Sequence, residues 1–392
     1  MFKNDDTAYL QSLLDTRETK VYFPYKKEGY TISAPLRIYS NQSLCVDRFT
    51  VIRLAGESNC RMLQNDDWAN GNCNVEVCGG IWDMNNLAQA KNPLHFPYPE
   101  REKGKGFGYN DNYFGTAIQF FNVKNLLVHD LTVKDPVTFA IQSAKIFNAD
   151  FMNIIFDFNY GNPYPINMDG VHLDGDCHHV RISNLKGNAY DDLVALNADD
   201  CYCGPIENVV VDGLYVDEAH SAVRMLSTGS PVRNVTITNV FGRYYQYAVA
   251  FSKYFNEDTG ETRDGVTDHG VFENITLSKL YISKAPRYSI YQKDGGFVYP
   301  LIWIENRTKV SGLHIRDLYR DESDTPIETI GVDPMGTVED LIIDGVHQTN
   351  STETPITMLY NQGKIEGLEI SRVRIGEDIV FKGNLDEIGK DI

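Results

Sequence analysis

The sequence has no apolar run of the roughly 20 residues that a membrane-spanning helix needs. Residues 1–6, Met-Phe-Lys-Asn-Asp-Asp, also lack the apolar stretch of a secretory leader. We therefore expect a cytoplasmic protein with no membrane partner. A secreted protein whose leader had been removed would show the same beginning.

Positive charge is scarce, because 36 Lys and Arg stand against 54 Asp and Glu, for a formal net charge of −18. Such a surface does not attract nucleic acid or anionic membranes at long range, so we expect neither as a partner. A polyanionic substrate would be repelled as well. The alternative interpretation is that the acidity serves solubility alone.

Cysteines are few and odd in number, with seven in the chain: Cys45, Cys60, Cys73, Cys78, Cys177, Cys201 and Cys203. An odd count in a large chain argues against a secreted disulfide framework. No pair has the Cys-x-x-Cys spacing of a zinc site, and no calcium-binding loop is visible. We expect buried free thiols, no metal and no cofactor.

Helical periodicity is nearly absent, whereas one strand-like pattern returns many times: a polar residue, alternating aliphatics, then Asp, Asn or Gly, then another aliphatic. Clear copies span 125–131, 179–185, 208–214, 234–240, 274–280, 312–318, 340–346 and 367–373, with less regular ones near 74–79 and 153–158. The first aliphatic of each copy recurs after 26 to 40 residues, for example at Leu126, Ile154, Val180, Val209 and Val235.

These units hold several short strands and no stretch of 10–15 helical residues, so βαβ folds fit poorly. The pattern predicts an all-β protein, a right-handed parallel β-helix forming one domain over 1–392, because a solenoid can exceed the roughly 250–300 residues of a compact core. Residues 6–14 predict a helix in an N-terminal cap over 1–20. The irregular stretch 87–114 predicts a long loop at the wall of a cleft.

A second strand follows within each coil, and we expect these strands to stack as one parallel sheet. The aliphatics expected to point into the coil are Ile118, Ile141, Val171, Val194, Val223, Val249 and Ile302. Alternation then points the next residues outward: Gln119, Gln142, His172, Ala195, Arg224, Ala250 and Trp303.

Three carboxylates precede two neighbouring strands of this sheet, in Asn167-Met-Asp-Gly-Val-His-Leu173 and Tyr190-Asp-Asp-Leu-Val-Ala-Leu-Asn197. Because stacked strands lie about 4.8 Å apart, Asp169, Asp191 and Asp192 should be close together. Three such groups do not all ionise easily, so one should stay protonated as an acid while another acts as a base. Inverting glycoside hydrolysis needs that division. The alternative is that these residues only cap turns between coils.

The two motifs resemble those of the polygalacturonase-type glycoside hydrolases of family 28, which have a pectin lyase-like parallel β-helix fold. Their Asn-Thr-Asp-Gly and Asp-Asp signatures match residues 167–170 and 191–192, and the resemblance extends over about 122–254. It implies that Asp191 is the general acid, that Asp169 and Asp192 hold the nucleophilic water, and that no metal is needed.

Two other motifs of the family are altered in this chain. Its Gly-His-Gly motif corresponds to Ala219-His220-Ser221, where His220 would orient the acid or bind a sugar hydroxyl, or would simply be a turn histidine. Its Arg-Ile-Lys motif falls near 249–253, with Ala250 at the arginine position and Lys253 at the end. Arg224 would replace the lost charge toward a uronate carboxylate, or pair with an aspartate.

Three further residues are candidates for substrate binding. His172 is expected to face outward close to Asp169, where it would bind a sugar hydroxyl. Tyr254 and Trp303 would stack on pyranose rings. Lys253 joins these as a candidate through the resemblance.

Two rival functions remain open on the same fold. The first is a polysaccharide lyase or epimerase, which would give an ultraviolet-absorbing product if it were a lyase. The second is a noncatalytic carbohydrate-binding β-helix. The sequence leaves the sugar, the linkage and the oligomeric state undetermined, and a short oligosaccharide cut from one end is our expectation for the substrate.

Overall fold

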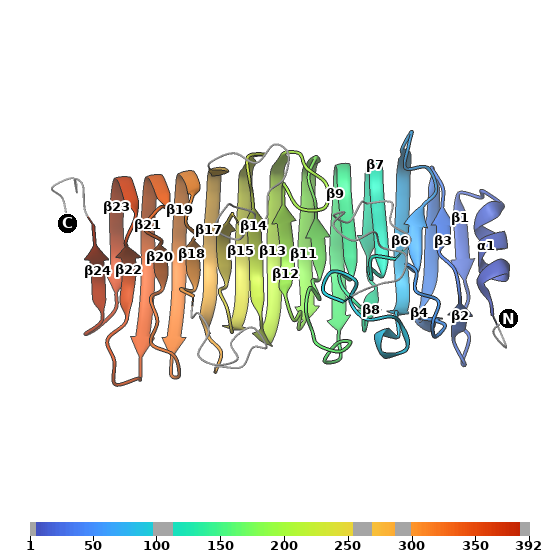
Figure 1. Ribbon diagram of the computed structural model, residues 1–392, viewed down its shortest axis with the longest axis horizontal. Helices are drawn as coiled ribbons and strands as arrows, with labels where there is room; N and C mark the ends of the chain where they lie inside the picture. Colours follow the sequence, from blue (N-terminus) through green and yellow to red (C-terminus); the bar gives the residue numbers. More distant parts are fainter. Residues whose placement is uncertain (1–4, 97–112, 254–268, 287–298, 385–392) are drawn as a thin grey trace.

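The computed structural model describes residues 5–96, 113–253, 269–286 and 299–384. Its strands join one continuous parallel sheet of 24 strands, wound into coils that stack along the long axis (Figure 1). Helix α1 (Thr7–Asp15) covers one end of the stack, and β24 lies at the other. The predicted parallel β-helix with an N-terminal capping helix is confirmed.

Each coil combines a long strand with shorter ones. The long strands are β4 (Gln42–Leu54), β6 (Asn72–Asp83), β7 (Ile118–His129), β9 (Ile141–Asp157), β11 (Cys177–Gly187), β13 (Ile206–Ala219), β15 (Val232–Tyr244), β17 (Gly270–Lys284), β19 (Thr308–Glu322), β21 (Thr337–Asn350) and β23 (Lys364–Arg374). The short strands are β1 (Lys20–Phe23), β2 (Tyr30–Ile32), β3 (Leu36–Ile38), β5 (Leu63–Asn65), β8 (Thr132–Lys134), β10 (Val171–Leu173), β12 (Asp192–Asn197), β14 (Ser221–Leu226), β16 (Val249–Ser252), β18 (Ile302–Ile304), β20 (Ile330–Val332), β22 (Thr357–Asn361) and β24 (Ile379–Gly383).

The register of the short strands agrees with the predicted alignment. Val171 pairs with Ile141 on one side and Val194 on the other, and these aliphatics are fully buried in the coil interior. The alternate positions also stack, with His172 beside Ala195 and Ala195 beside Arg224. These aliphatic stacks form the hydrophobic core, which continues from α1 to the last coils.

One copy of the repeat was placed wrongly. Ile154 does not occupy the position between Leu126 and Val180; Ala149 pairs with both. The true copy begins at Asn148, and Ile154 instead pairs with Leu185 at the second aliphatic position of the unit. The error arose because β9 carries two Asn residues five positions apart, and the small Ala149 gave a weaker aliphatic signal.

The asparagine that opens many repeats has a structural explanation. Asn74, Asn125 and Asn148 adopt left-handed backbone conformations, with φ of 56°, 59° and 59°, which Asn tolerates better than most residues. Their side chains also bond to one another across coils, at 2.8 Å between Asn125 and Asn74 and 3.1 Å between Asn148 and Asn125. Asparagine therefore fits both the turn and the stacking.

Aromatic rings form a second ladder on the long strands. Tyr215, Phe241, Tyr281 and Tyr319 stack at centroid separations of 5.2, 4.8 and 4.9 Å. The ring faces contact one another, so mainly the ring edges reach solvent. The tyrosines of this ladder are 41–42% exposed.

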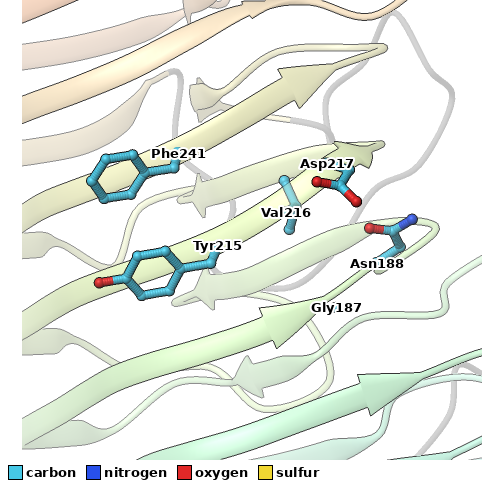
Figure 2. A pocket seen from close by; sticks show the side chains of 6 residues that line it. All are labelled: Gly187, Asn188, Tyr215, Val216, Asp217 and Phe241. Atoms are coloured by element: carbon cyan, nitrogen blue, oxygen red, sulfur yellow. The ribbon is translucent and has the colours of Figure 1, made fainter.

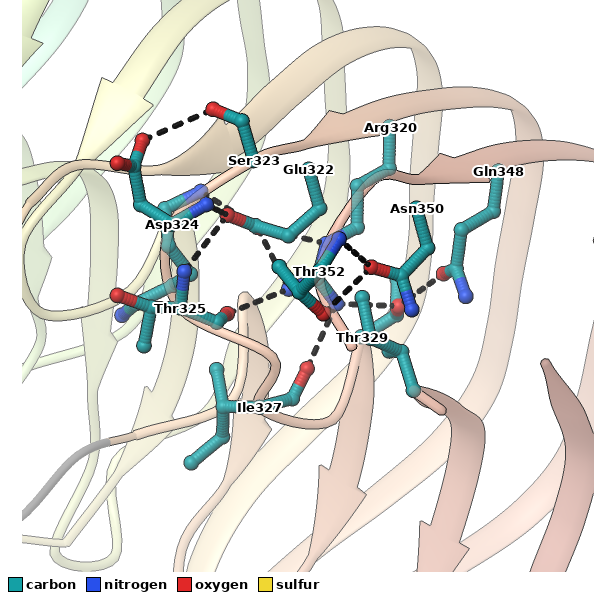
Figure 3. A network of polar contacts seen from close by, with 12 residues as sticks. Arg320, Glu322, Ser323, Asp324, Thr325, Ile327, Thr329, Gln348, Asn350 and Thr352 are labelled. Carbon is teal, nitrogen blue, oxygen red and sulfur yellow. Dashed lines mark hydrogen bonds and ion pairs between the residues drawn. The ribbon is translucent and has the colours of Figure 1, made fainter. Parts of the chain in front are cut away.

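Near the C-terminal end, a buried ion pair fixes a turn (Figure 3). Arg320 and Glu322 are fully buried at 2.7 Å, and Arg320 also donates to the Ile327 carbonyl and the Thr329 hydroxyl. Glu322 in turn accepts the backbone amides of Asp324 and Thr325. The pair thus satisfies polar groups that the coil would otherwise bury without partners.

The N-terminal cap packs Leu10 and Leu14 of α1 into the core. Asp6 precedes the helix, but its carboxylate binds Lys26 and the Thr31 amide rather than the helix. None of the helices in the described ranges is long and apolar enough to cross a membrane.

The predicted 87–114 loop is described only in part. The short 3₁₀ helix η1 (Asn86–Ala88) overlaps its beginning, while 97–112 lies outside the described residues. None of the cysteines forms a disulfide. Cys177 is buried as expected, but Cys203 is exposed and the other five are half-buried, so the prediction of buried thiols was wrong for most of them.

The asparagine ladder leads to a first prediction. Asn234 has φ 56° and bonds to Asn208 and Asn274. Asn234→Ala should lower the free energy of unfolding by about 1–2 kcal/mol, since alanine resists the left-handed conformation. Asn234→Gly, which accepts that conformation, should lose less. Urea unfolding measures both, and an alanine variant as stable as wild type would contradict the explanation.

Candidate active site

The three predicted carboxylates come together on neighbouring coils. Asp169 lies just before β10, Asp191 just before β12, and Asp192 is the first residue of β12. The Gly170 amide donates to the Asp192 carbonyl at 3.0 Å, which joins the two motifs directly. Asp169 and Asp192 are 3% and 2% exposed, whereas the Asp191 side chain is 15% exposed. Asp191 is thus the carboxylate of the three that most faces solvent.

Asp192 is held by two hydroxyl groups. Ser221 donates to Asp192 Oδ1 at 2.5 Å, and Tyr247 donates to the same oxygen at 3.4 Å. Burial and the neighbouring Asp191 raise the pKa of Asp192 to about 6, although Arg224, Ser221 and His220 oppose the shift. The cluster therefore retains a proton at mildly acidic pH.

His220 lies beside the acid predicted from the sequence. Its Nδ1 is 3.5 Å from Asp191 Oδ1 and 3.2 Å from Ser221 Oγ. Because Ser221 gives its hydrogen to Asp192, the assignment that satisfies these contacts makes Nδ1 the donor. Burial lowers the pKa of His220 to about 4, so the ring is neutral at pH 7. His220 is therefore close enough to orient Asp191, which was one of the three alternatives expected for it, and that role stays a prediction.

His172 occupies a different environment from the one expected. Both ring nitrogens face carboxylates, with Nδ1 2.6 Å from Asp169 and Nε2 3.3 Å from Asp174. The Phe139 ring stacks on it at 4.0 Å, and the residue is only 1% exposed. Burial opposes protonation of this imidazole, but Asp174 and Asp169 outweigh it and raise the pKa well above the usual value. The geometry therefore favours orienting Asp169 over binding a sugar hydroxyl.

The other candidates are distributed around this centre. Arg224 stacks beside Ala195, and its Nε donates to Ser252 Oγ at 2.9 Å. Trp303 is half-buried and packs against Tyr299 and Tyr247, with centroids at 4.3 and 5.8 Å. Lys253 is 1% exposed, and its amide donates to Glu305 at 2.6 Å. Tyr254 lies outside the described residues.

Several residues of this centre were missed by sequence reasoning. Ser221 directly follows the chosen His220, and Asp174 lies two residues after the chosen His172, a spacing at which strand periodicity places both side chains on one face. Tyr247 was one of several clustered tyrosines and carried no distinguishing signal. Glu305 contacts Lys253 from more than 50 residues away, which a single sequence does not reveal.

The predicted 87–114 loop also reaches the site. Asn92 donates to Asn167 Oδ1 at 3.2 Å, and His95 Nε2 lies 2.9 Å from the same atom. The Asn167 amide in turn donates to Asp191 at 3.2 Å. The described part of the loop therefore borders the segment that supports Asp191.

Two groups of side chains at the site have the donor atoms of a cation site. Asp191, Asp192 and His220 form one group, while His172, Asp174 and Asp200 form the other. In the second group, the His172 Nε2 atom that would bind a cation lies 3.7 Å from Asp200.

A pocket of about 360 Å³ lies over the long strands β11, β13 and β15 (Figure 2). It is lined by Gly187, Asn188, Tyr215, Val216, Asp217 and Phe241. Asp217 is the one ionisable carboxylate in this lining, so the pocket does not supply an acid and a base together.

The raised pKa of Asp192 leads to a prediction about stability. The folded-state pKa of about 6 exceeds 3.8, so stability gained from protonation is present below pH 3.8 and lost as pH rises through 6. Asparagine has no carboxyl group to ionise, so Asp192→Asn does not lose this stability as pH rises. We compare the free energy of unfolding of the variant with that of wild type at each pH. This difference should favour the variant by about 2–3 kcal/mol more at pH 7.5 than at pH 4. Urea unfolding at both pH values measures it; Asp217→Asn, at an exposed site, should show no such gain, and an equal gain there would contradict the assignment.

Comparisons with known proteins give the fold independently. No family model matches the chain. The endo-xylogalacturonan hydrolase of Aspergillus tubingensis superposes with a TM-score of 0.57 at 14% identity, covering 97% of this chain and 96% of that one. The family 28 exopolygalacturonase of Yersinia enterocolitica gives 0.56 at 14% identity, covering 93% and 75%. A mannuronan C-5 epimerase A-module of Azotobacter vinelandii gives 0.50 at 11%, covering 97% and 94%. This chain is similar to these β-helix proteins in fold.

Proposed function

We propose that the protein is an inverting glycoside hydrolase of the polygalacturonase type, a divergent member of family 28, acting on an oligosaccharide or polysaccharide. The observation that carries the proposal is the joining of Asp169, Asp191 and Asp192 on adjacent coils, with a retained proton in the cluster. A turn-capping role alone does not explain why two of these carboxylates are almost fully buried. Burial of charge is costly, and acid–base chemistry is a reason to maintain it.

Asp191 is the proposed acid because it is the most exposed of the three carboxylates. The acid must reach the glycosidic oxygen of a substrate that arrives from solvent. The neutral His220 ring beside it holds the carboxyl group in place without adding a positive charge that would favour the ionised form. The raised pKa of Asp192 keeps a proton inside the cluster. Coupled carboxyl groups share such a proton, so it is available to Asp191.

Asp169 and Asp192 are the proposed carboxylates that bind and activate the attacking water. Their fixed partners support this role: His172 bonds to Asp169, and Ser221 bonds to Asp192. Each carboxylate keeps a second oxygen that its hydrogen bond to the named partner does not use. A water between them would lose a proton to a carboxylate as it attacks the anomeric carbon.

A first test replaces the proposed acid. Asp191→Asn should lower kcat by about 10²- to 10⁴-fold, the usual contribution of a general acid. The assay follows new reducing ends and ultraviolet absorbance together on a panel of uronate-containing and neutral oligosaccharides. Wild type should release reducing ends without absorbance, and Asp217→Asn should match wild type. An absorbing product would indicate a lyase, and a fully active Asp191→Asn would exclude this acid.

Arg224 is the proposed partner of a uronate carboxylate, because the family's arginine position is Ala250 here. The guanidinium stacks one coil from Ala195, within electrostatic reach of Asp191 and Asp192. Its planar group binds carboxylates in a bidentate way that lysine does not reproduce. Substrate binding by Arg224 would therefore select a sugar that carries a carboxylate.

A second test uses Arg224→Lys, which keeps the charge. It should reduce kcat/KM on uronate oligosaccharides by about 10- to 100-fold, the value of one or two charge-assisted hydrogen bonds. Activity on neutral oligosaccharides should stay near the wild-type level. Equal losses on both substrate types would assign Arg224 to supporting the aspartates instead.

A further inference from the structure

Far from the carboxylates, three side chains with metal-binding atoms stack in one column near the N-terminal end. Cys45 of β4 pairs in register with Cys78 of β6, and Cys78 pairs with His129 of β7. The Cys45 and Cys78 sulfur atoms are 3.0 Å apart without a disulfide bond. All three residues are half-buried on the outer surface of the coil, where an ion can reach them.

A fourth donor comes from the same face. Glu76 lies two residues before Cys78, and its Oε1 is 3.0 Å from His129 Nε2. The ligand atoms of Glu76, Cys78 and His129 all lie within 4.8 Å of one another. One sulfur, one imidazole nitrogen and one carboxylate oxygen therefore come together, and the Cys45 sulfur lies beside the sulfur of this group, 3.0 Å from Cys78 Sγ.

His129 is held in the orientation of a metal ligand. Its Nδ1 lies 2.6 Å from Asp130, and its Nε2 lies 3.0 Å from Glu76 Oε1. Asp130 is itself fixed by the Asn153 amide at 2.9 Å. The ring nitrogen of a metal-bound histidine that does not bind the metal commonly donates its N–H to a carboxylate in this way, which fixes the tautomer.

We propose that Cys45, Cys78, His129 and Glu76 form a zinc-binding site. Zinc favours four ligands in a tetrahedron, with thiolate and imidazole as preferred donors. A Zn–S distance of about 2.3 Å requires the sulfurs to separate somewhat beyond 3.0 Å, which small side-chain rotations supply. The proposal goes beyond the glycosidase function, because the four residues belong to strands remote from Asp169 and Asp191.

The proposed ligands come from three neighbouring long strands, β4, β6 and β7. A bound ion would cross-link three successive coils next to the N-terminal cap.

The site escapes sequence inspection for a simple reason. Cys45 and Cys78 are 33 residues apart, so no short motif connects them. Their proximity arises from the coil length and the parallel register alone.

The test is a titration of the reduced, metal-stripped full chain with Co²⁺, which reports tetrahedral thiolate ligation through visible d–d bands and near-ultraviolet charge transfer. Wild type should develop both bands with one equivalent, and Zn²⁺ should displace them. Cys78→Ser and Cys45→Ser should each weaken binding by at least tenfold and reduce the charge-transfer band. His129→Gln should weaken binding while keeping that band.

Cys73→Ser is the matched control, because Cys73 is a half-buried thiol of the same strand β6. It should bind Co²⁺ like wild type. Circular dichroism verifies that each variant is folded, and two independent cysteine variants protect the test if one fails to fold. No thiolate band in reduced wild type would overturn the proposal. A Cys45–Cys78 disulfide in air, with no metal binding after reduction, would overturn it as well.

Discussion

In-register parallel stacking is the constraint on which the rest of this molecule depends. Each coil places its residues about 4.8 Å above the equivalent residues of the coil before it. Neighbours in space are therefore equivalents in the repeat, separated by a whole coil in sequence. The asparagine ladder, the aromatic ladder, the thiol column and the aspartate cluster all result from this one rule. In the asparagine and aromatic ladders, side chains of one kind lie next to one another in successive coils.

Such stacking favours amides and aromatic rings but disfavours like charges. Asparagines bond along the ladder, and rings stack face to face. Aspartates repel, and the response of the structure is visible around Asp192, where hydroxyl donors and a retained proton reduce the charge. A ladder with a purely structural role would not need hydroxyl donors and a retained proton to offset repulsion between carboxylates. The site therefore departs locally from the consistency that the rest of the coils show, as functional sites commonly do.

Much of the architecture was predictable, because the alternation of aliphatic residues and the spacing of the repeats indicate the strands and their register. The alternation of aliphatics gave the coils and correctly placed His172, Ala195 and Arg224 on one column. The placement failed at β9, where Ala149 weakened the aliphatic pattern and a second asparagine competed.

The immediate surroundings of the site were less predictable. Periodicity says which face a side chain takes but not what covers that face. His172 points away from the coil interior as expected, yet Phe139 and Asp174 enclose it. Contacts such as Tyr247 with Asp192 depend on turn geometry that varies from coil to coil, and no single sequence reports it.

The central claim is that water, activated by Asp169 and Asp192, replaces the leaving sugar at the anomeric carbon. The most direct measurement is hydrolysis of an accepted oligosaccharide in H₂¹⁸O, with mass spectrometry of the products and proton NMR of the first anomer formed. The account predicts one ¹⁸O at each new reducing end and inverted anomeric configuration. Cleavage without ¹⁸O, or retention of configuration, would contradict it.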